Sequence, residues 1–214
     1  MKSPREKVTA LFLDGANLHF IQKKLGWEID FEKLYNHFAK ETNLYNAFYY
    51  TAVDKDSATY TESQQFLDNL SFVGYTVRTK DIKIIRAGFK EVRKGNLDIE
   101  IVIDMFNTKD LYDRAILFSG DSDFERALEL LRTYGKEIEV VSSRGFVARE
   151  LLNAADKYQD LAHMRTILEK TKSVQKPQHS QVQKTSSTQE TAKVTTNQVR
   201  TLPKRPMIKR TPTY

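Results

Sequence analysis

The sequence predicts an α/β fold in which helices cover both faces of a mostly parallel sheet. Short apolar runs alternate along the chain with segments of helical periodicity, and 40% of the residues are apolar, enough to bury a sizeable core. Strands that alternate with helices of about 10 to 15 residues form βαβ units, whose strands lie parallel in one sheet. We therefore expect a single three-layered domain, residues 1–169, followed by a tail, residues 170–214.

In the N-terminal half, strands and helices are expected in alternation. Val8–Leu13 is an apolar run typical of a buried strand, and it ends at Asp14-Gly15. Phe31–Lys40 carries its apolar residues three or four positions apart, the spacing of one helix face. Tyr45–Val53 is aromatic and β-rich and predicts a second strand. The next expected elements are a helix at Thr59–Val73 and strands at Tyr75–Lys80 and Lys83–Arg86.

The C-terminal half continues this alternation. Leu97–Phe106 is apolar on almost every side, which predicts a helix that is buried all round. Asp123–Tyr134 has helical periodicity and is followed by Gly135, a residue type that commonly ends helices. The remaining expected elements are strands at Ala115–Phe118 and Ile138–Val141 and a closing helix at Phe146–Leu161.

The net charge of +6 is unevenly distributed along the chain. Residues 170–214 hold ten Lys or Arg and a single acid, whereas residues 1–169 hold 24 basic and 27 acidic side chains. The tail also contains four of the five prolines and none of the glycines. Such a composition predicts disorder, because it cannot bury enough apolar surface to offset the entropy of ordering. The basic tail is expected either to aid solubility or to capture RNA or a protein partner.

The chain contains no cysteine, which excludes disulfides, thiolate zinc sites and a cysteine nucleophile. No run approaches the roughly 20 continuous apolar residues of a membrane-spanning helix. The apolar run near the N-terminus is too short for a secretory signal. A cytoplasmic location is therefore expected.

Acidic residues follow two of the predicted strands. Asp14 ends the first strand, and Asp121 and Asp123 follow Ala115–Phe118. Open parallel sheets bind ligands beyond the carboxyl ends of their strands, so these carboxylates meet if the two strands are neighbours. Asp98, where the predicted buried helix begins, is a further candidate. Carboxylates that converge without Lys or Arg repel one another and need a cation, and ligation by oxygen alone suits Mg²⁺ or Mn²⁺.

Each acid also has a structural explanation. Asp14-Gly15 can form a turn, and Ser122–Glu125 has the pattern of a helix capping box. Asp98 can stabilise a helix N-terminus by its charge. Asp104 interrupts an apolar run, but about 120° separates it from Asp98 on an ideal helix, so we do not expect the two to share one ion. Asp104 is instead expected to orient another group or to cap a loop.

Three segments together resemble the signature of NYN domains of the LabA-like group, which are similar in fold to PIN nucleases. Each segment is a weak signal alone, but three in order within an α/β pattern are specific. The resemblance covers roughly residues 7–161 and implies a Rossmann-like sheet, an acidic pocket and metal-dependent ribonuclease chemistry. The segments are Leu13-Asp14-Gly15-Ala16-Asn17-Leu18, Lys94-Gly95-Asn96-Leu97-Asp98 and Ser119-Gly120-Asp121-Ser122-Asp123-Phe124.

Carried over by position, the resemblance implies metal ligands at Asp14, Asp98, Asp121 and Asp123. Asp14 and Asp121 would hold one Mg²⁺ or Mn²⁺, and the other two acids would complete its shell or hold a second ion. Asn17 would bind substrate or a metal-bound water. Ser119 and Asp104 are further site candidates, the latter matching a recurring acid of the family.

The resemblance has one departure and one alternative. Asn96-Leu97 stands where a β-branched residue before the Asp is more usual in the family, and little effect is expected from it. Some family members are known as regulators rather than as nucleases. The alternative function is therefore an RNA-binding or protein-interacting regulator with little or no turnover.

Residues 78–94 carry seven basic side chains and two acidic ones. An RNA backbone held there would lead into the acidic pocket through Lys94, and Phe89 would either stack on a base or pack. The alternative is a solvated hairpin with charges of both signs. The candidates for RNA binding are Arg78, Lys80, Lys83, Arg86, Lys90, Arg93 and Lys94.

Other enzyme classes fit less well. The dinucleotide fingerprint, the P-loop and the nucleophile elbow of serine hydrolases are all absent from the sequence. Gly120-Asp121-Ser122-Asp123 resembles the metal loop of haloacid-dehalogenase-type phosphatases. The nucleophile motif of those enzymes needs a second Asp two residues after the first, where this chain has Ala16.

Overall fold

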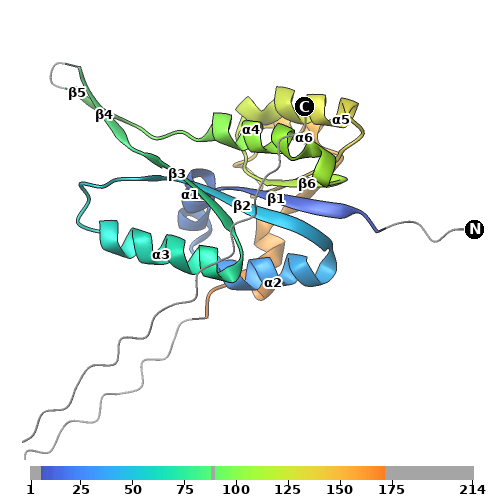
Figure 1. The fold of residues 1–214 in the computed structure, drawn as a ribbon, viewed down its shortest axis with the longest axis horizontal. Coiled ribbons are helices and arrows are strands. Elements are labelled where there is room, and N and C mark those ends of the chain that lie inside the picture. Colours follow the sequence, from blue (N-terminus) through green and yellow to red (C-terminus); the bar gives the residue numbers. More distant parts are fainter. Residues whose placement is uncertain (1–5, 88–89, 172–214) are drawn as a thin grey trace, which may run out of the picture. The chain divides into compact units, whose positions relative to one another are not determined.

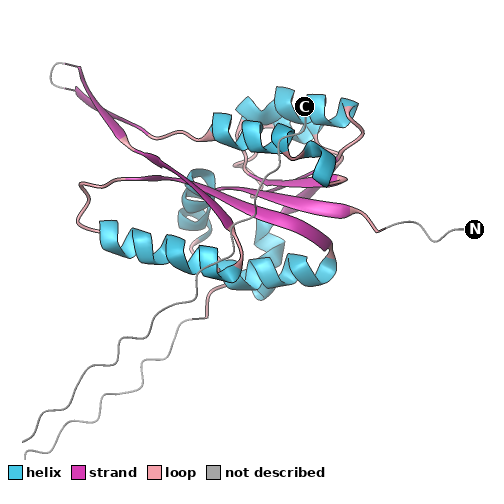
Figure 2. Ribbon diagram, viewed as in Figure 1, coloured by secondary structure: helices cyan, strands magenta, loops and turns pink. Residues whose placement is uncertain are grey.

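A computed structural model describes residues 6–87 and 90–171 of the chain. Within these residues, six strands form one sheet and two more form a separate antiparallel hairpin. Helices lie on both faces of the larger sheet (Figure 2). This arrangement confirms the predicted α/β, three-layered, Rossmann-like fold. Phe89 and the predicted tail from residue 172 onward lie outside the described residues.

The order of strands in the large sheet is β3-β2-β1-β6-β7-β8, and every neighbouring pair is parallel. From β1 the chain first builds outward on one side and later returns to build outward on the other. The order therefore reverses between β1 and β6, and the crevice beyond the carboxyl ends of such a pair is where α/β sheets bind ligands. The strands are β1 (Val8–Asp14), β2 (Asn43–Val53), β3 (Thr76–Asp81), β6 (Arg114–Phe118), β7 (Glu137–Ser142) and β8 (Lys157–Asp160).

Side chains of β1 alternate between two cores because successive residues of a strand point to opposite faces. Leu11 and Leu13 belong to one core, and Ala10 and Phe12 belong to the other. The first core is closed by α1 (Gly15–Leu25), α2 (Phe31–Glu41), α3 (Tyr60–Val73) and α7 (Arg165–Leu168). The second is closed by α4 (Asp98–Asn107), α5 (Glu125–Thr133) and α6 (Arg149–Ala154), as Figure 1 shows above the sheet.

The hairpin and three short 3₁₀ helices complete the described chain. The hairpin joins β4 (Lys83–Ala87) to β5 (Lys90–Lys94) between β3 and α4 and extends away from the sheet (Figure 1). The 3₁₀ helices are η1 (Lys109–Leu111), η2 (Ser122–Phe124) and η3 (Leu161–Met164). No described helix combines the length and the apolar character needed to cross a membrane.

Helix α1 has no counterpart among the predicted elements, since Asp14-Gly15 was compatible with a simple turn. The helix begins directly at the end of β1, and the Asp14 carboxylate caps it by accepting a hydrogen bond from the Asn17 amide at 3.0 Å. Gly15 allows this close junction. A Cβ at that position would lie 2.5 Å from the backbone oxygen of Tyr50.

The predicted single helix at Phe146–Leu161 is wrong. The segment forms the short helix α6 and then the edge strand β8. Asp156 explains the change, because its backbone amide donates to the Ile138 oxygen at 2.9 Å and its carboxylate accepts from the Ile138 amide at 2.8 Å. These two bonds hold the chain beside β7, where pairing continues the sheet.

The prediction that Leu97–Phe106 is buried on all sides is also wrong. Helix α4 buries Ile101 and Met105 against the sheet, but Ile99 and Ile103 are 70% and 50% exposed. In the described part of the chain α4 is an outer layer, so one of its apolar faces meets solvent.

Candidate metal centre

Asp14 is the innermost acid of the candidate site. It ends β1 beside β6 and is 8% exposed. Its two carboxylate oxygens accept hydrogen bonds from the Asn17 amide and from the Ser119 hydroxyl, each at 3.0 Å. The carboxylate is therefore fixed in position by groups from both strand ends.

Asn17 and Ser119 connect the two strand ends across the switch point. The Asn17 side-chain oxygen accepts from the Gly120 amide at 3.1 Å, and the Ser119 hydroxyl accepts from the Asp121 amide at 3.3 Å. Ser119 is completely buried. These bonds set the path of the loop that carries Asp121 relative to the start of α1.

Asp121 and Asp123 lie on that loop. The Asp121 carboxylate caps η2 by accepting from the Asp123 amide at 3.0 Å. The cap is therefore Asp121 rather than the Ser122 of the capping-box pattern. Asp121 is half-buried and Asp123 is exposed.

Asp98 is brought to the same place by the start of α4. Asn96 holds it through two hydrogen bonds. The Asn96 side-chain nitrogen donates to the Asp98 carboxylate, and the Asn96 side-chain oxygen accepts from the Asp98 backbone amide at 2.9 Å. The expectation that the departure at Asn96-Leu97 has little effect stays a prediction. Asn96 itself fixes the position of Asp98. The motif could not reveal this, because the bond depends on the conformation of the loop after β5.

One carboxylate oxygen from each of Asp98, Asp121 and Asp123 lies within 4.8 Å of the others. Asp14 adjoins this group across a cavity of about 640 Å³, which Asp14, Asn17, Asp98 and Asp121 help to line. Among the described residues, none of the four acids forms an ion pair with Lys or Arg. Tyr50 and Thr51 also line the cavity and were not predicted as site residues.

The acids of the cavity raise one another's pKa. Burial is the largest cause of the raised pKa of Asp14, and the charges of Asp98 and Asp121 add to it against its two hydrogen bonds. Burial likewise raises the pKa of Asp98, with further contributions from the charges of Asp121 and Asp123. The folded chain thus holds these carboxylates where their negative charge is disfavoured, and a bound cation would reverse that effect.

Asp104 lies outside the cluster, as the helical spacing predicted. Its carboxylate accepts from the Tyr50 hydroxyl at 3.1 Å and from the Arg78 guanidinium at 2.9 Å. Asp104 thereby orients Tyr50, which lines the cavity, and links α4 to β2 and β3. Its position is that of a supporting residue rather than of a metal ligand.

The basic segment is only partly free to hold a nucleic acid. Arg78 pairs with Asp104, and Lys80 pairs with Glu100 at 2.8 Å and donates to the Asn96 backbone oxygen at 3.3 Å. Lys83 is exposed at the base of the hairpin. The side chains of the other four candidates lie outside the described residues, although their backbone forms the hairpin: Arg86, Lys90, Arg93 and Lys94.

The model of the NYN domain family matches residues 8–162 of this chain, which is most of its length. The chain belongs to the NYN domain family. The domain is similar to the Low amplitude and bright protein LabA of Synechococcus elongatus, with 48% identity over 167 residues that cover 76% of this chain and 88% of LabA. It also resembles the crystal structure of a protein of unknown function from Vibrio parahaemolyticus.

The Vibrio protein shares the fold of this NYN domain. The two match with a TM-score of 0.62 and 24% identity, over 75% of this chain and 96% of the other. All three sequence motifs lie within the matched residues of the family. Asp14, Asp98 and Asp121 line one cavity at the switch point of the sheet, and Asp123 lies beside Asp98 and Asp121.

Proposed function

We propose that this NYN domain is a metal-dependent ribonuclease that hydrolyses RNA phosphodiester bonds at its cluster of Asp residues. The observation that carries the proposal is the convergence of three carboxylate oxygens within 4.8 Å, beside buried Asp14, without an ion-paired Lys or Arg among the described residues. Carboxylates crowded in this way serve a binding site for RNA phosphates poorly, because they repel the phosphates. They suit a site that holds a divalent cation.

The residues present fit Mg²⁺ or Mn²⁺. The donor set consists of carboxylate oxygens alone, which these ions prefer. Asp98, Asp121 and Asp123 would hold the ion, with Asp14 on the buried side of the cavity. When bound, such an ion activates a water molecule and stabilises the leaving oxygen in phosphodiester cleavage.

The other polar groups of the cavity have roles that follow from their hydrogen bonds. Ser119 and the Asn17 amide keep Asp14 in one orientation. The Asn17 side chain uses its oxygen to accept from Gly120, and its nitrogen donates to no group in the described residues. Asn17 lines the cavity that the acids border, and in this proposal its nitrogen donates to a phosphate oxygen of RNA.

The hairpin supplies the contacts to the RNA backbone in this proposal. Lys83 is exposed, and its Cα partner in the strand register is Lys94, so the base of the hairpin carries two basic residues. Lys94 immediately precedes Gly95 and Asn96, which line the cavity. Basic side chains at this point would hold the phosphates of a strand that enters the acidic site.

One observation favours the alternative, a binding regulator with little turnover. Ile99 and Ile103 form an exposed apolar strip on α4, directly after Asp98. Such a strip suits contact with another protein. In that case the acids would hold an ion without cleaving RNA.

The proposal is tested by incubating end-labelled single-stranded RNA with the protein and Mg²⁺ or Mn²⁺, with EDTA as the control. We expect metal-dependent shortening of the RNA, and we expect Asp14→Asn and Asp121→Asn to abolish it while both variants remain folded by circular dichroism. RNA that is retarded on a native gel but keeps its full length with wild-type protein would instead support the binding regulator.

A further inference from the structure

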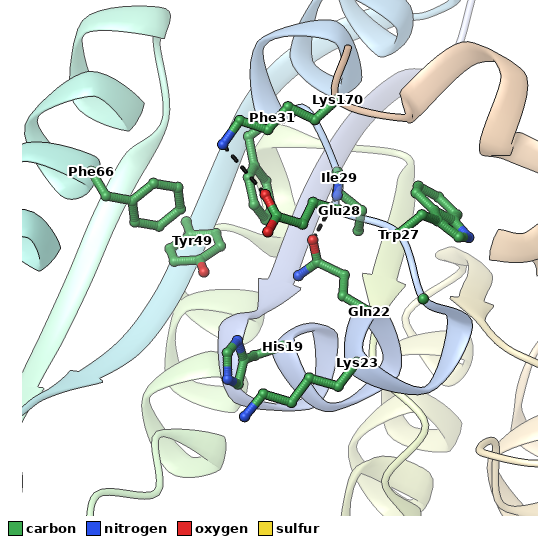
Figure 3. Close-up of a pocket in the computed structure, with 11 residues that line it drawn as sticks. His19, Gln22, Lys23, Trp27, Glu28, Ile29, Phe31, Tyr49, Phe66 and Lys170 are labelled. Carbon is green, nitrogen blue, oxygen red and sulfur yellow. Dashed lines mark hydrogen bonds and ion pairs between the residues drawn. The ribbon is translucent and has the colours of Figure 1, made fainter. Parts of the chain in front are cut away.

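A second cavity, of about 530 Å³, lies on the face of the sheet that α1, α2 and α3 cover (Figure 3). Side chains from α1, from the loop that follows it and from α2, β2 and α3 line it. None of the acids of the candidate metal centre is among its lining residues. The nuclease proposal therefore leaves this cavity without a role.

One wall of the cavity is aromatic. The rings of Phe31, Tyr49 and Phe66 contact one another edge to face, with centroids 5.2 to 5.8 Å apart. Phe66 is 39% exposed, so part of its ring remains open to a ligand. Aromatic rings that keep a free surface in a cavity provide a stacking platform for a nucleobase.

The hydroxyl of Tyr49 is an unpartnered polar group in this wall. Tyr49 is 6% exposed, yet its hydroxyl forms no hydrogen bond with any described residue. The other buried tyrosines all donate: Tyr50 to Asp104, Tyr75 to the Phe31 oxygen and Tyr112 to the Met105 oxygen. Figure 3 shows the Tyr49 hydroxyl pointing toward the side of the cavity where His19 lies. The Tyr49 hydroxyl is not among the fully buried polar atoms that lack a partner, so it borders the open space of the cavity and is free to donate to a molecule bound there.

Tyr49 is a donor at physiological pH. Burial, reinforced by the charge of Asp14, raises the pKa of its hydroxyl well above the ordinary value of a tyrosine. The hydroxyl therefore keeps its proton and can donate to an oxygen or nitrogen of a bound molecule.

Positive charge stands beside the aromatic wall. His19 and Lys23 of α1 line the cavity, and neither forms an ion pair within the described residues. Lys170 stands at the opposite side and pairs with Glu28 at 3.4 Å, both side chains being more than 60% exposed. A stacking wall beside the unpaired ammonium of Lys23 and the imidazole of His19, a group that can hydrogen-bond, matches a molecule with a planar base and an attached phosphate, which is a nucleotide unit.

Helix α1 connects this cavity to the metal centre. Ala16 lines the metal-centre cavity, and His19 and Lys23, three and seven residues further on, line the second one. Residues at this spacing share one face of a helix, and about 10 Å of helix axis separates the first from the last. A single RNA strand along this face can have one phosphate at the acids and a neighbouring nucleotide in the second cavity.

We propose that the cavity between α1, Tyr49 and Phe66 binds one nucleotide unit of single-stranded RNA, with the base against Phe66 and Phe31, a hydrogen bond from Tyr49, and the phosphate near His19 and Lys23. This assignment rests on the proposed nuclease function for its choice of RNA over a free nucleotide. A free nucleotide and a nucleotide within RNA offer the same base and phosphate. The experiment below therefore has one arm for each of them.

The test is a titration with adenosine 5′-monophosphate, followed by NMR, in EDTA so that the metal centre makes no contribution. Ribose 5-phosphate, which lacks the base, and adenosine, which lacks the phosphate, are the matched ligands. We expect the nucleotide to bind at least fivefold more tightly than either. Phe66→Ala should weaken it by about 5- to 160-fold, the range of one base stack. Lys23→Gln should weaken the nucleotide but not adenosine.

Tyr49→Phe provides a sharper test, because it removes only the hydroxyl. We expect about fivefold weaker nucleotide binding with an unchanged Tm, since the hydroxyl has no described partner to lose. Tyr112→Phe is the matched control: it removes a buried hydroxyl that donates to Met105, so it should lower the Tm and leave nucleotide binding unchanged.

The RNA arm adds a short single-stranded oligonucleotide in EDTA. We expect it to displace the nucleotide and to bind Phe66→Ala more weakly than wild type. No nucleotide binding, equal binding of ribose 5-phosphate, or insensitivity to Phe66→Ala would overturn the proposal, and a nucleotide that RNA fails to displace would overturn its assignment to RNA. Nucleotide binding that depends on Phe66, without RNA cleavage under Mg²⁺, would reject the nuclease function and support this site. RNA cleavage under Mg²⁺ with binding that does not depend on Phe66 would reject this site alone.

Discussion

At the residue scale, the pKa values of Asp14 and Asp98 reflect the burial of these carboxylates and their closeness to other acids. Both are raised, mainly by burial and further by the neighbouring carboxylates. A carboxyl group whose pKa rises on folding destabilises the folded state once the pH passes its unfolded value, and the effect is complete above its folded pKa. At neutral pH these acids therefore oppose folding until a cation joins them.

Replacing Asp98 by Asn should for this reason stabilise the protein in the absence of metal. The amide oxygen keeps an acceptor for Asn96, while the charge near Asp121 and Asp123 disappears. We expect the Tm of Asp98→Asn at pH 7 in EDTA to rise by roughly 2–4 °C. Mg²⁺ should raise the Tm of wild type but have a smaller effect on the variant.

Thermal unfolding with and without Mg²⁺ checks this prediction. Asp110→Asn is the control, because Asp110 is 81% exposed and lies outside the cluster, so its Tm should change little in either condition. A lower Tm for Asp98→Asn in EDTA would contradict the repulsion between the acids, and an undiminished response to Mg²⁺ would show that Asp98 does not hold the ion.

At the scale of elements, hydrogen bonds between neighbours hold the cavity in shape. The Asp104 carboxylate of α4 joins Arg78 of β3 to Tyr50 of β2. Lys80 of β3 joins Glu100 of α4 and the loop at Asn96. The base of the hairpin and the start of α4 are thereby fixed together, and this fixes Asp98.

Asp104→Ala should separate this supporting role from metal binding. The substitution leaves the buried Tyr50 hydroxyl and the Arg78 guanidinium without their acceptor, so we expect the free energy of unfolding to fall by about 1–3 kcal/mol. The Tm increase caused by Mg²⁺ should persist. Urea denaturation and the Mg²⁺ response measure the two effects, and loss of the Mg²⁺ response without loss of stability would place Asp104 in the metal site instead.

The elements also show what local sequence patterns can predict. The strands that end in acids follow from apolar runs, whereas their neighbouring positions were only a condition in the sequence and are supplied by the pairing of β1 with β6. The strand β8 does not, because its pairing depends on bonds between Asp156 and Ile138, which are distant in sequence. Helix α1 was missed because Asp14-Gly15 suits a turn as well as a helix start.

The candidate site was predictable to the same extent. The motif acids stand at the ends of strands and helices, and such ends can be recognised from the local sequence. The roles of Asn96 and Tyr50, and the pairing of Arg78 and Lys80 with acids of α4, depend on contacts across the fold. No periodicity or motif spacing encodes such contacts.

At the scale of the whole domain, the two edges of the parallel sheet differ in how their charges are arranged. The carboxyl edge gathers acids without ion-paired cations among the described residues. At the amino edge, Glu137 at the start of β7 pairs with Lys157 at 2.7 Å and with Lys7. Its pKa is lowered to about 2, chiefly by the hydrogen bonds to Lys157 and Lys7. The sheet therefore separates a stabilising charge cluster from the candidate site.

Glu137→Gln should reveal this stabilisation through its pH dependence. A carboxyl group with a lowered pKa contributes stability above its unfolded value of 4.5, and that contribution is lost as the pH falls toward about 2. We expect the variant to be less stable at pH 7 by roughly 1–2 kcal/mol, because exposed lysines weaken the pairing by solvent screening. Urea denaturation from pH 7 to pH 3 should show the difference shrinking, whereas a constant difference would contradict this explanation.

The claim that the Asp cluster cleaves RNA is tested most directly by a single-turnover cleavage assay on end-labelled RNA. Wild type, Asp98→Asn, Asp121→Asn and Asp104→Asn are compared in Mg²⁺ and in EDTA, each shown to be folded. We predict cleavage by wild type in Mg²⁺ alone, a loss of at least a hundredfold for the two cluster variants, and a loss of less than tenfold for Asp104→Asn. Full-length RNA with wild type, or equal cleavage by all four proteins, would contradict the account.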